Sequence, residues 1–197
     1  MTDNLYWHES RIDRKKREIL NDHKSFVIWF TGLSGAGKST IANALEEKLH
    51  EKGIHTYLLD GDNIRKGLNS DLGFSPEARR ENIRRIAEVS KLFVDSGIVV
   101  LTAFISPYKS DRNFARKLFD EGDFIEVHVD CDIKTCIQRD TKGLYKKAMA
   151  GMIDDFTGIS APYEIPEKPE IIVNTDLNTV EENIAVIADR IAEKISF

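Results

Sequence analysis

The chain has 197 residues, a net charge of −5 and a pI near 5.6. This length suits a single domain with a substantial core, and the acidic balance argues against a protein that coats nucleic acid, because such proteins carry a basic excess. No apolar run approaches the roughly 18 residues of a membrane span, and no apolar signal segment opens the chain. We therefore expect a cytoplasmic protein that binds neither membrane nor nucleic acid.

Residues 1–24 are polar and rich in charge, which predicts an N-terminal extension ahead of one domain at residues 25–197. Their composition indicates a solvated helix or a mobile arm. Tyr6 and Trp7 are large aromatic residues that usually pack against something, either this domain or a second subunit.

The most specific feature of the sequence is a phosphate-binding loop. Residues 32–39 fit G-x-x-x-x-G-K-[ST] without a mismatch, between an apolar strand pattern at residues 26–30 and a helical pattern that begins at Ile41. Glycines let the backbone turn its N–H groups toward phosphate oxygens at a helix N-terminus. Lys38 should reach the β- and γ-phosphates of a nucleotide, and Ser39 should ligate Mg²⁺. The nucleotide-binding residues are expected to be Gly32, Leu33, Ser34, Gly35, Ala36, Gly37, Lys38, Ser39 and Thr40.

Two carboxylates follow the second predicted strand, at residues 56–59. Asp60 and Asp62 would lie at the edge where open α/β sheets bind ligands. Turn formation by Asp and Asn explains residues 60–63 equally well when they are taken alone. Proximity to the phosphate loop favours a functional role.

A basic helix is predicted over residues 75–95, with Ser75 as its N-cap. Its first half contains four arginines, and guanidinium groups are suited to bidentate binding of phosphate or sulfate. We expect one or two of them to bind an anionic substrate and the others to face solvent. They are Arg79, Arg80, Arg84 and Arg85.

The rest of the chain alternates strand and helix patterns. Strands are predicted over residues 98–104, 124–129 and 171–173, and helices over residues 110–119, 135–139 and 179–195. The basic stretch at residues 140–166, which is punctuated by Gly and Pro, is a candidate lid. These elements predict a three-layer P-loop α/β fold, with a five-stranded parallel sheet and helices on both faces.

We expect structural roles for three residues whose types often take part in catalysis or metal binding. Cys131 and Cys136 lack the spacing of metal ligands, so we expect small buried side chains in a reducing cytosol. His128 is interpreted as a strand residue rather than a base.

The position of the acids separates classes of nucleotide-binding protein. Motor and recombinase ATPases need a carboxylate at the end of a later strand, whereas the third strand here ends without an acid and Asp130 is the single late candidate. Acids beside the phosphate loop suit a small-molecule kinase, in which a carboxylate orients an acceptor hydroxyl for in-line attack. A kinase acting on a nucleoside monophosphate or a sugar acid, and a binding module without transfer activity, are the alternatives.

The phosphate loop and several later segments together resemble adenylyl-sulfate kinase. The resemblance runs over residues 7–175, and the segments are specific as a set. They are WFTGLSGAGKST at 29–40, DGDNIR at 60–65, GLN at 67–69, DLGFS at 71–75, ENIRR at 81–85, FISP at 104–107, KGLYKK at 142–147, FTG at 156–158 and PYE at 162–164. Lys66, Ala78 and Thr141 depart from the family's usual residues, and none of them matches a residue with an assigned role.

The resemblance implies transfer of the ATP γ-phosphoryl group to the 3′-hydroxyl of adenosine 5′-phosphosulfate, with Mg²⁺ as the metal and a homodimer as the assembly. Lys38, Asp62 and Ser106 would be the catalytic residues, and Asp60 would hold the ion together with Ser39. Ser106 matches a serine that is phosphorylated in some members, although a loop-forming or substrate-contacting serine is the alternative. Arg139 would lie near the ATP base and phosphates. The implied substrate-binding residues are Asp62, Arg65, Phe74, Arg79, Asn82, Ile105, Ser106, Lys142, Leu144 and Phe156.

Overall fold

The computed structural model describes residues 6, 8 and 10–196, so the expectation for Trp7 lies outside the described part of the chain. Within that part the strands are β1 (Val27–Thr31), β2 (Thr56–Asp60), β3 (Val99–Ala103), β4 (Phe124–Asp130) and β5 (Ile171–Asn174). They pair in parallel as one sheet in the order β2-β3-β1-β4-β5. The predicted five-stranded parallel sheet is confirmed.

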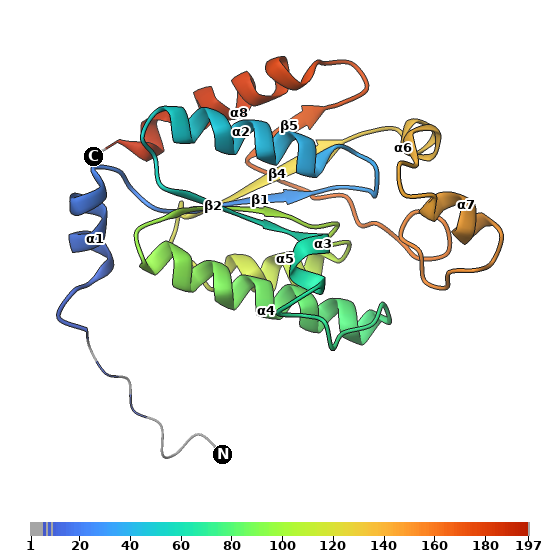
Figure 1. Cartoon of the computed structure of the whole chain (residues 1–197), viewed down its shortest axis with the longest axis horizontal. Coiled ribbons are helices and arrows are strands. Elements are labelled where there is room, and N and C mark those ends of the chain that lie inside the picture. The colour runs from blue at the N-terminus through green and yellow to red at the C-terminus, as the bar shows by residue number, and fades with distance from the viewer. Residues whose placement is uncertain (1–5, 7, 9, 197) are drawn as a thin grey trace.

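Four helices of the described residues cover the sheet. They are α2 (Lys38–Glu51), α4 (Pro76–Asp95), α5 (Lys109–Arg116) and α8 (Val180–Ile195). α2 and α8 lie on one face, and α4 and α5 lie on the other (Figure 1). The other helices are α1 (Arg14–Asn21), α3 (Gly61–Arg65), α6 (Ile133–Arg139) and α7 (Leu144–Met149). No helix in the described part of the chain is long and apolar enough to cross a membrane.

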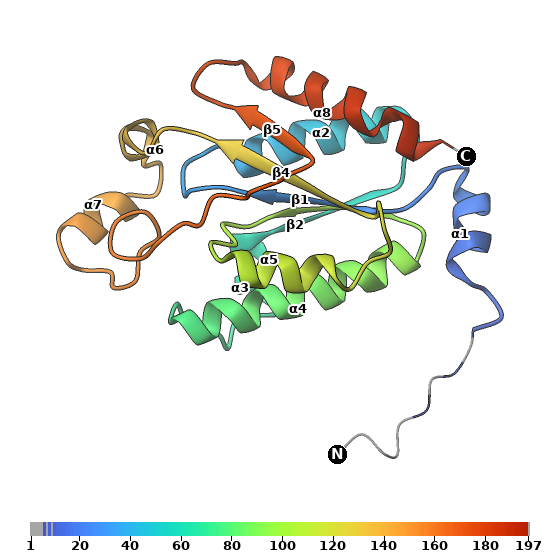
Figure 2. The same ribbon diagram turned by 180° about the vertical axis from the view of Figure 1, so that it is seen from behind.

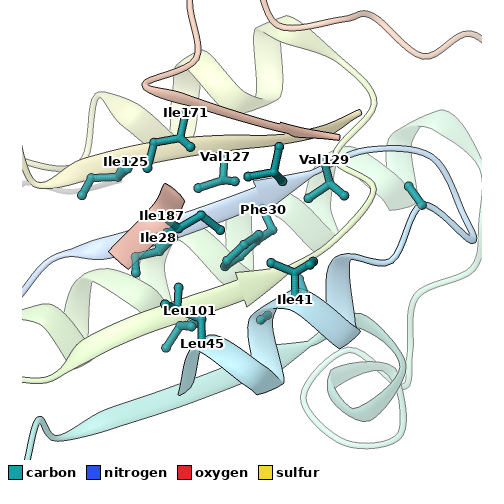
Figure 3. Close-up of a cluster of buried hydrophobic side chains, with 14 of the residues drawn as sticks. Ile28, Phe30, Ile41, Leu45, Leu101, Ile125, Val127, Val129, Ile171 and Ile187 are labelled. Carbon is teal, nitrogen blue, oxygen red and sulfur yellow. The ribbon is translucent and has the colours of Figure 1, made fainter. Parts of the chain in front are cut away.

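The core lies on both sides of β1, every residue of which is buried. Alternate side chains of a strand point to opposite faces. Ile28 and Phe30 therefore pack with Leu45 of α2 and Ile187 of α8 (Figure 3), whereas Trp29 joins the cluster beneath α4. Burial of each such side chain contributes about 1.5–3 kcal/mol. The loop that follows β1 consequently starts from a rigid base.

The strand order decides which segments meet. β1 is the middle strand and β3, whose apolar run suggested a central position, is its neighbour. Because all the strands are parallel, their carboxyl ends share one edge of the sheet. α6 and α7 lie beyond that edge, and α1 lies at the opposite edge (Figures 1 and 2).

Two short helices, α3 and α7, lie where the sequence did not predict a helix. After β2, Asp60 acts as the N-cap of α3 and accepts a hydrogen bond from the Asp62 amide at 3.0 Å. Asp60 therefore has the turn-forming role that the sequence analysis gave as an alternative for residues 60–63. Within the proposed lid, residues 144–149 form α7. Sequence patterns miss such helices because five or six residues are too few to show a helical period.

The N-terminal segment contains a helix that is attached to the domain. Asp13 caps α1 by accepting from the Lys16 amide at 2.9 Å. Arg14 donates to Ser25 Oγ at 2.9 Å and pairs with Asp123. The helical alternative therefore describes residues 14–21, and its charged side chains serve partly as attachments.

Candidate active site

A cleft of about 1000 Å³ opens at the carboxyl edge of the sheet. This volume is at the upper end for small-molecule sites, which leaves room for two guests. Most of the predicted site residues line it, and Gly32, Leu33 and Ala36 do not. The predicted residues on its wall are Ser34, Gly35, Gly37, Lys38, Ser39, Thr40, Asp60, Asp62, Arg65, Phe74, Arg79, Asn82, Ile105, Ser106, Arg139, Lys142, Leu144 and Phe156.

The phosphate loop requires glycine at two positions, one because of close packing and the other because of its backbone conformation. A Cβ on Gly32 would lie 2.6 Å from the carbonyl oxygen of Val129. Gly37 has φ +93° and forms the N-cap of α2 without a side-chain hydrogen bond. The first N–H groups of α2 therefore have no side-chain cap and, together with the helix dipole, can bind an anion.

Lys38 lies inside this loop. Its Nζ donates to the carbonyls of Gly32 at 3.0 Å and Leu33 at 2.7 Å. Burial, with a smaller contribution from nearby Lys142, lowers the pKa of Lys38 to about 8. The ammonium group is held at the loop before any phosphate arrives, and an incoming phosphate would favour its charged form.

Ser39 and Asp60 form the candidate metal site. Ser39 Oγ donates to Asp60 Oδ2 at 2.6 Å, and both residues line the cleft. Hydroxyl and carboxylate oxygens are the ligands that Mg²⁺ prefers, so this donor set fits that ion. Among the described residues, no cluster of three or more His, Cys, Asp or Glu side chains could hold a metal. Phosphate oxygens would have to complete the coordination, as is usual for Mg²⁺.

Asp62 lies on α3 and lines the cleft. It forms an ion pair with Lys142, which precedes α7. Both side chains are more than half exposed, so the pair contributes little to stability. The pair matters because it brings the lid segment into contact with Asp62, the carboxylate that was predicted to face the acceptor hydroxyl.

The wall near Asp62 carries positive charge. Arg65 and Arg79 lie over the Phe74 ring, with guanidinium carbons 4.4 Å and 5.7 Å from its centroid. Arg65 donates to the carbonyls of Leu72 and Gly73, and Arg79 donates to those of Phe74 and Asp155. Burial lowers the pKa of both arginines. In the part of the chain that the structure describes, neither forms an ion pair with a carboxylate, so an anionic guest can supply the missing charge.

Residues 24–174 match the family model described as adenylylsulphate kinase. The chain belongs to the adenylyl-sulfate kinase family. Adenylyl-sulfate kinases of Staphylococcus carnosus and Staphylococcus haemolyticus are 58% and 55% identical to it, over 93% and 97% of this chain and 92% and 96% of their own. An APS kinase of Mycobacterium tuberculosis, solved in complex with AMPPNP and APS, superposes with a TM-score of 0.82 at 46% identity, over 86% of this chain and 98% of its own.

The arginine cluster of this family member is divided between the cleft and the surface. Of the four arginines, Arg79 lines the cleft. Arg84 and Arg85 pair with Glu81, and Arg85 also pairs with Asp71. Arg80 is exposed and lies 3.7 Å from Asp111. The last three are therefore accounted for by interactions on the surface.

The lid segment rests on the phosphate loop. Tyr145 of α7 donates its hydroxyl proton to the carbonyl of Ser34 at 2.9 Å, and its ring meets Phe156 edge-on at a centroid distance of 5.0 Å. Lys142, Leu144 and Phe156 line the cleft on this side. The motif at residues 142–147 did not predict this role of Tyr145, because the role depends on a contact with Ser34, which is distant in the sequence.

Residues after β5 complete the nucleotide end of the cleft, and the sequence reading missed them. Arg139 donates to the Thr175 carbonyl at 2.7 Å, and Thr175 Oγ1 donates to the Ala36 carbonyl at 2.9 Å. Asn178 and Asn183 line the cleft beside them. The available signal was that the fifth strand ends at the same edge as the phosphate loop.

The structural interpretations of the remaining residues agree with the fold. Cys131 and Cys136 are buried free thiols, and burial raises the pKa of Cys136 to about 12. His128 is buried in β4 and stacks with Tyr163. Asp130 is not among the cleft residues and accepts from Asn174 Nδ2 at 3.2 Å.

Proposed function

We propose that the protein transfers the γ-phosphoryl group of ATP to the 3′-hydroxyl of adenosine 5′-phosphosulfate (APS), giving 3′-phosphoadenylyl sulfate and ADP in sulfate activation. One observation carries the proposal: one cleft is faced by a phosphate loop, two carboxylates, and two arginines that form no ion pair with a carboxylate among the described residues. Family membership supports it, since relatives of similar length bear the name of this activity.

On the nucleotide side, the loop N–H groups and Lys38 would hold the phosphates, and Arg139 would lie beside the base and phosphates. Ser39 and Asp60 would hold Mg²⁺, which when bound neutralises phosphate charge. The transition state of phosphoryl transfer is loose, so positioning and charge neutralisation supply most of the catalysis. Fixed N–H groups and a buried ammonium suit that requirement.

On the acceptor side, Arg65 and Arg79 would bind the phosphosulfate, and Asn82 the sugar. The rings of Phe74 and Phe156 would lie on either side of the adenine, where aromatic faces stack well. Asp62 would orient the 3′-hydroxyl and accept its proton as the bond to phosphorus forms. This carboxylate pairs with Lys142 of the lid segment, so Lys142 would lie beside the acceptor hydroxyl.

The lid would keep water away from the transferring group, because water is the competing acceptor. Lys142 and Leu144 would close over the bound acceptor as the lid moves.

The resemblance also implies a homodimer and phosphorylation of Ser106, and we propose both. A homodimer would be recognised by light scattering of the purified protein, and phosphorylation of Ser106 by intact-mass spectrometry after incubation with ATP.

The deciding test is acceptor selectivity in an ADP-release assay with APS, AMP and gluconate. We expect turnover with APS to exceed turnover with the other two by orders of magnitude. Preference for AMP or gluconate would identify another kinase of this fold, and no turnover with any acceptor would favour a binding module.

Asp62→Asn tests the mechanism within the same assay. We expect turnover with APS to fall by about 10²-fold or more, with ATP affinity nearly unchanged. The matched control is Asp71→Asn, an exposed carboxylate near the acceptor wall that pairs with Arg85 outside the cleft. Near-normal turnover in Asp62→Asn would remove this residue from the mechanism.

A further inference from the structure

A buried ion pair lies behind the acceptor wall, among residues that have no assigned role in the reaction. Arg112 of α5 is 3% exposed and Glu126 of β4 is 7% exposed. Arg112 Nε lies 2.8 Å from Glu126 Oε1. Removing two charges from water is costly unless their other polar groups also find partners. The remaining donors of Arg112 find them in two distant segments.

Arg112 joins the cleft wall to the end of the lid. Its Nη1 donates to the Ser106 carbonyl at 2.7 Å, and its Nη2 donates to the Glu164 carbonyl at 2.6 Å. Ser106 lines the cleft after β3, and Glu164 belongs to the lid segment, residues 140–166. A planar guanidinium can bridge these acceptors because its donors point in fixed directions.

The wall at Ser106 has a strained backbone. Ser106 has φ +38°, in the left-handed region that residues with a Cβ seldom adopt. Trp29 Nε1 donates to Ser106 Oγ at 3.2 Å, and Thr31 Oγ1 donates to the Ile105 carbonyl at 2.8 Å. Such a conformation persists only where its surroundings determine it. Arg112 is the charged member of those surroundings.

Two more bonds join the same segments. The Glu164 amide donates to the Pro107 carbonyl at 2.9 Å, and the Lys109 amide donates to Glu164 Oε2 at 2.6 Å. Earlier in the lid, Phe156 lines the cleft. The lid is therefore attached to the domain near its C-terminal end, at Glu164. Its earlier part, which includes Phe156, would contact the acceptor.

We propose that Arg112 is a positioning residue for the acceptor, an inference that rests on the proposed function. It holds residues 105–107 and the end of the lid in one fixed relation, so that Ser106 and Phe156 meet the acceptor at the correct separation. When its two carbonyl bonds are lost, the strained peptide relaxes and acceptor binding weakens. The phosphate loop lies elsewhere on the cleft and keeps its affinity for ATP.

Arg116 supplies a matched control on the same helix. Its Nη2 lies 3.2 Å from Glu126 Oε2, and its Nη1 lies 2.7 Å from Glu170 Oε1. It also donates to Glu170 Oε2 at 2.9 Å and to the Phe124 carbonyl at 3.2 Å. Arg116 thus shares a carboxylate with Arg112 but is attached to β4 and Glu170, away from the cleft wall.

The test compares Arg112→Lys with Arg116→Lys in steady-state kinetics over both substrates. A lysine keeps the charge beside Glu126 but cannot span two carbonyls in the way a guanidinium does. We expect the KM for APS to rise about tenfold in Arg112→Lys, with the KM for ATP changed less than about twofold. Arg116→Lys should leave both constants near wild type. An equal rise in both constants for Arg112→Lys, or the same rise for APS in Arg116→Lys, would overturn the inference.

Glu164→Ala tests the same attachment at a partly exposed residue, should Arg112→Lys fail to fold. It removes the acceptor of the Lys109 bond, and we expect the KM for APS to rise about threefold at an unchanged KM for ATP. An unaltered KM for APS in folded Glu164→Ala contradicts the inference. Wild-type protein that shows no turnover with APS would instead contradict the proposed function.

Discussion

The phosphate-loop wall and the acceptor wall share one cleft, but backbone atoms form the first and side chains form the second. The loop packs against the buried Val129, its own Ala36 is buried, and Thr175 donates a hydrogen bond to the Ala36 carbonyl. On the acceptor wall, Phe74 is 58% exposed and is held mainly by the two guanidinium groups over its ring.

This difference separates two tasks. Every nucleoside triphosphate presents the same phosphates, so a rigid backbone cradle is sufficient for that end of the reaction. The acceptor end must select one molecule and exclude water, and long side chains that exchange partners are better suited to it. Lys142 illustrates this point, because its long, exposed side chain reaches from the lid segment to Asp62 of α3.

Removal of the Lys38 side chain, the buried cation of the loop wall, should give the largest effect on turnover. We expect Lys38→Ala to lower kcat by about 10³-fold, because the transferring phosphoryl loses its buried cation. Lys52→Ala, at the exposed C-terminal end of the same helix, is the control and should be near wild type. Retention of a tenth or more of the activity in Lys38→Ala would mean that backbone groups alone suffice on this wall.

A charge removed from the acceptor wall should act on one substrate only. Arg79→Gln should raise the KM for APS by about 10- to 100-fold, the loss expected for one charge-assisted contact, and leave the KM for ATP almost unchanged. Arg84→Gln, on the same helix but paired with Glu81, should change neither constant. Parallel losses for both substrates in Arg79→Gln would show that the walls are not independent.

The pH dependence of ATP binding should depend on Lys38. Its pKa, lowered by burial to about 8, means that the free protein loses this charge as pH rises above 8. The pKa rises when phosphate binds, so binding requires proton uptake above pH 8, and the dissociation constant should increase by up to about tenfold per pH unit there. Calorimetric titration in buffers of different ionisation enthalpy would detect that proton. In Lys38→Ala the dependence should vanish.

Ionic strength should produce the smallest difference between the walls. The half-buried guanidinium groups of Arg65 and Arg79 are screened by salt more than the buried Lys38 of the loop is. We expect the KM for APS to rise about threefold between low and high salt, and the KM for ATP to rise less. Equal responses of the two constants would contradict the assignment of these two arginines to the acceptor alone.

Local patterns were sufficient to predict the sheet and the loop. The strand expected at residues 26–30 is found at Val27–Thr31, and the helix expected to begin near Ile41 begins at Lys38. Burial on both faces of β1 requires a continuous apolar run, and the φ of +93° at Gly37 favours glycine for a reason that is local to the backbone there. Such constraints leave a mark in any short stretch of sequence.

The partners of long polar side chains leave no comparable mark. Lys142 reaches Asp62 across 80 positions in the chain, and Arg112 bridges Ser106 and Glu164. These contacts exist because the crossovers of a β2-β3-β1-β4-β5 sheet bring the ends of separate strands to one edge. Many residues of the cleft could therefore be named from their motifs, but Thr175, Asn178 and Asn183 could not. Which residues of the cleft touch each other was decided by the packing of the whole domain.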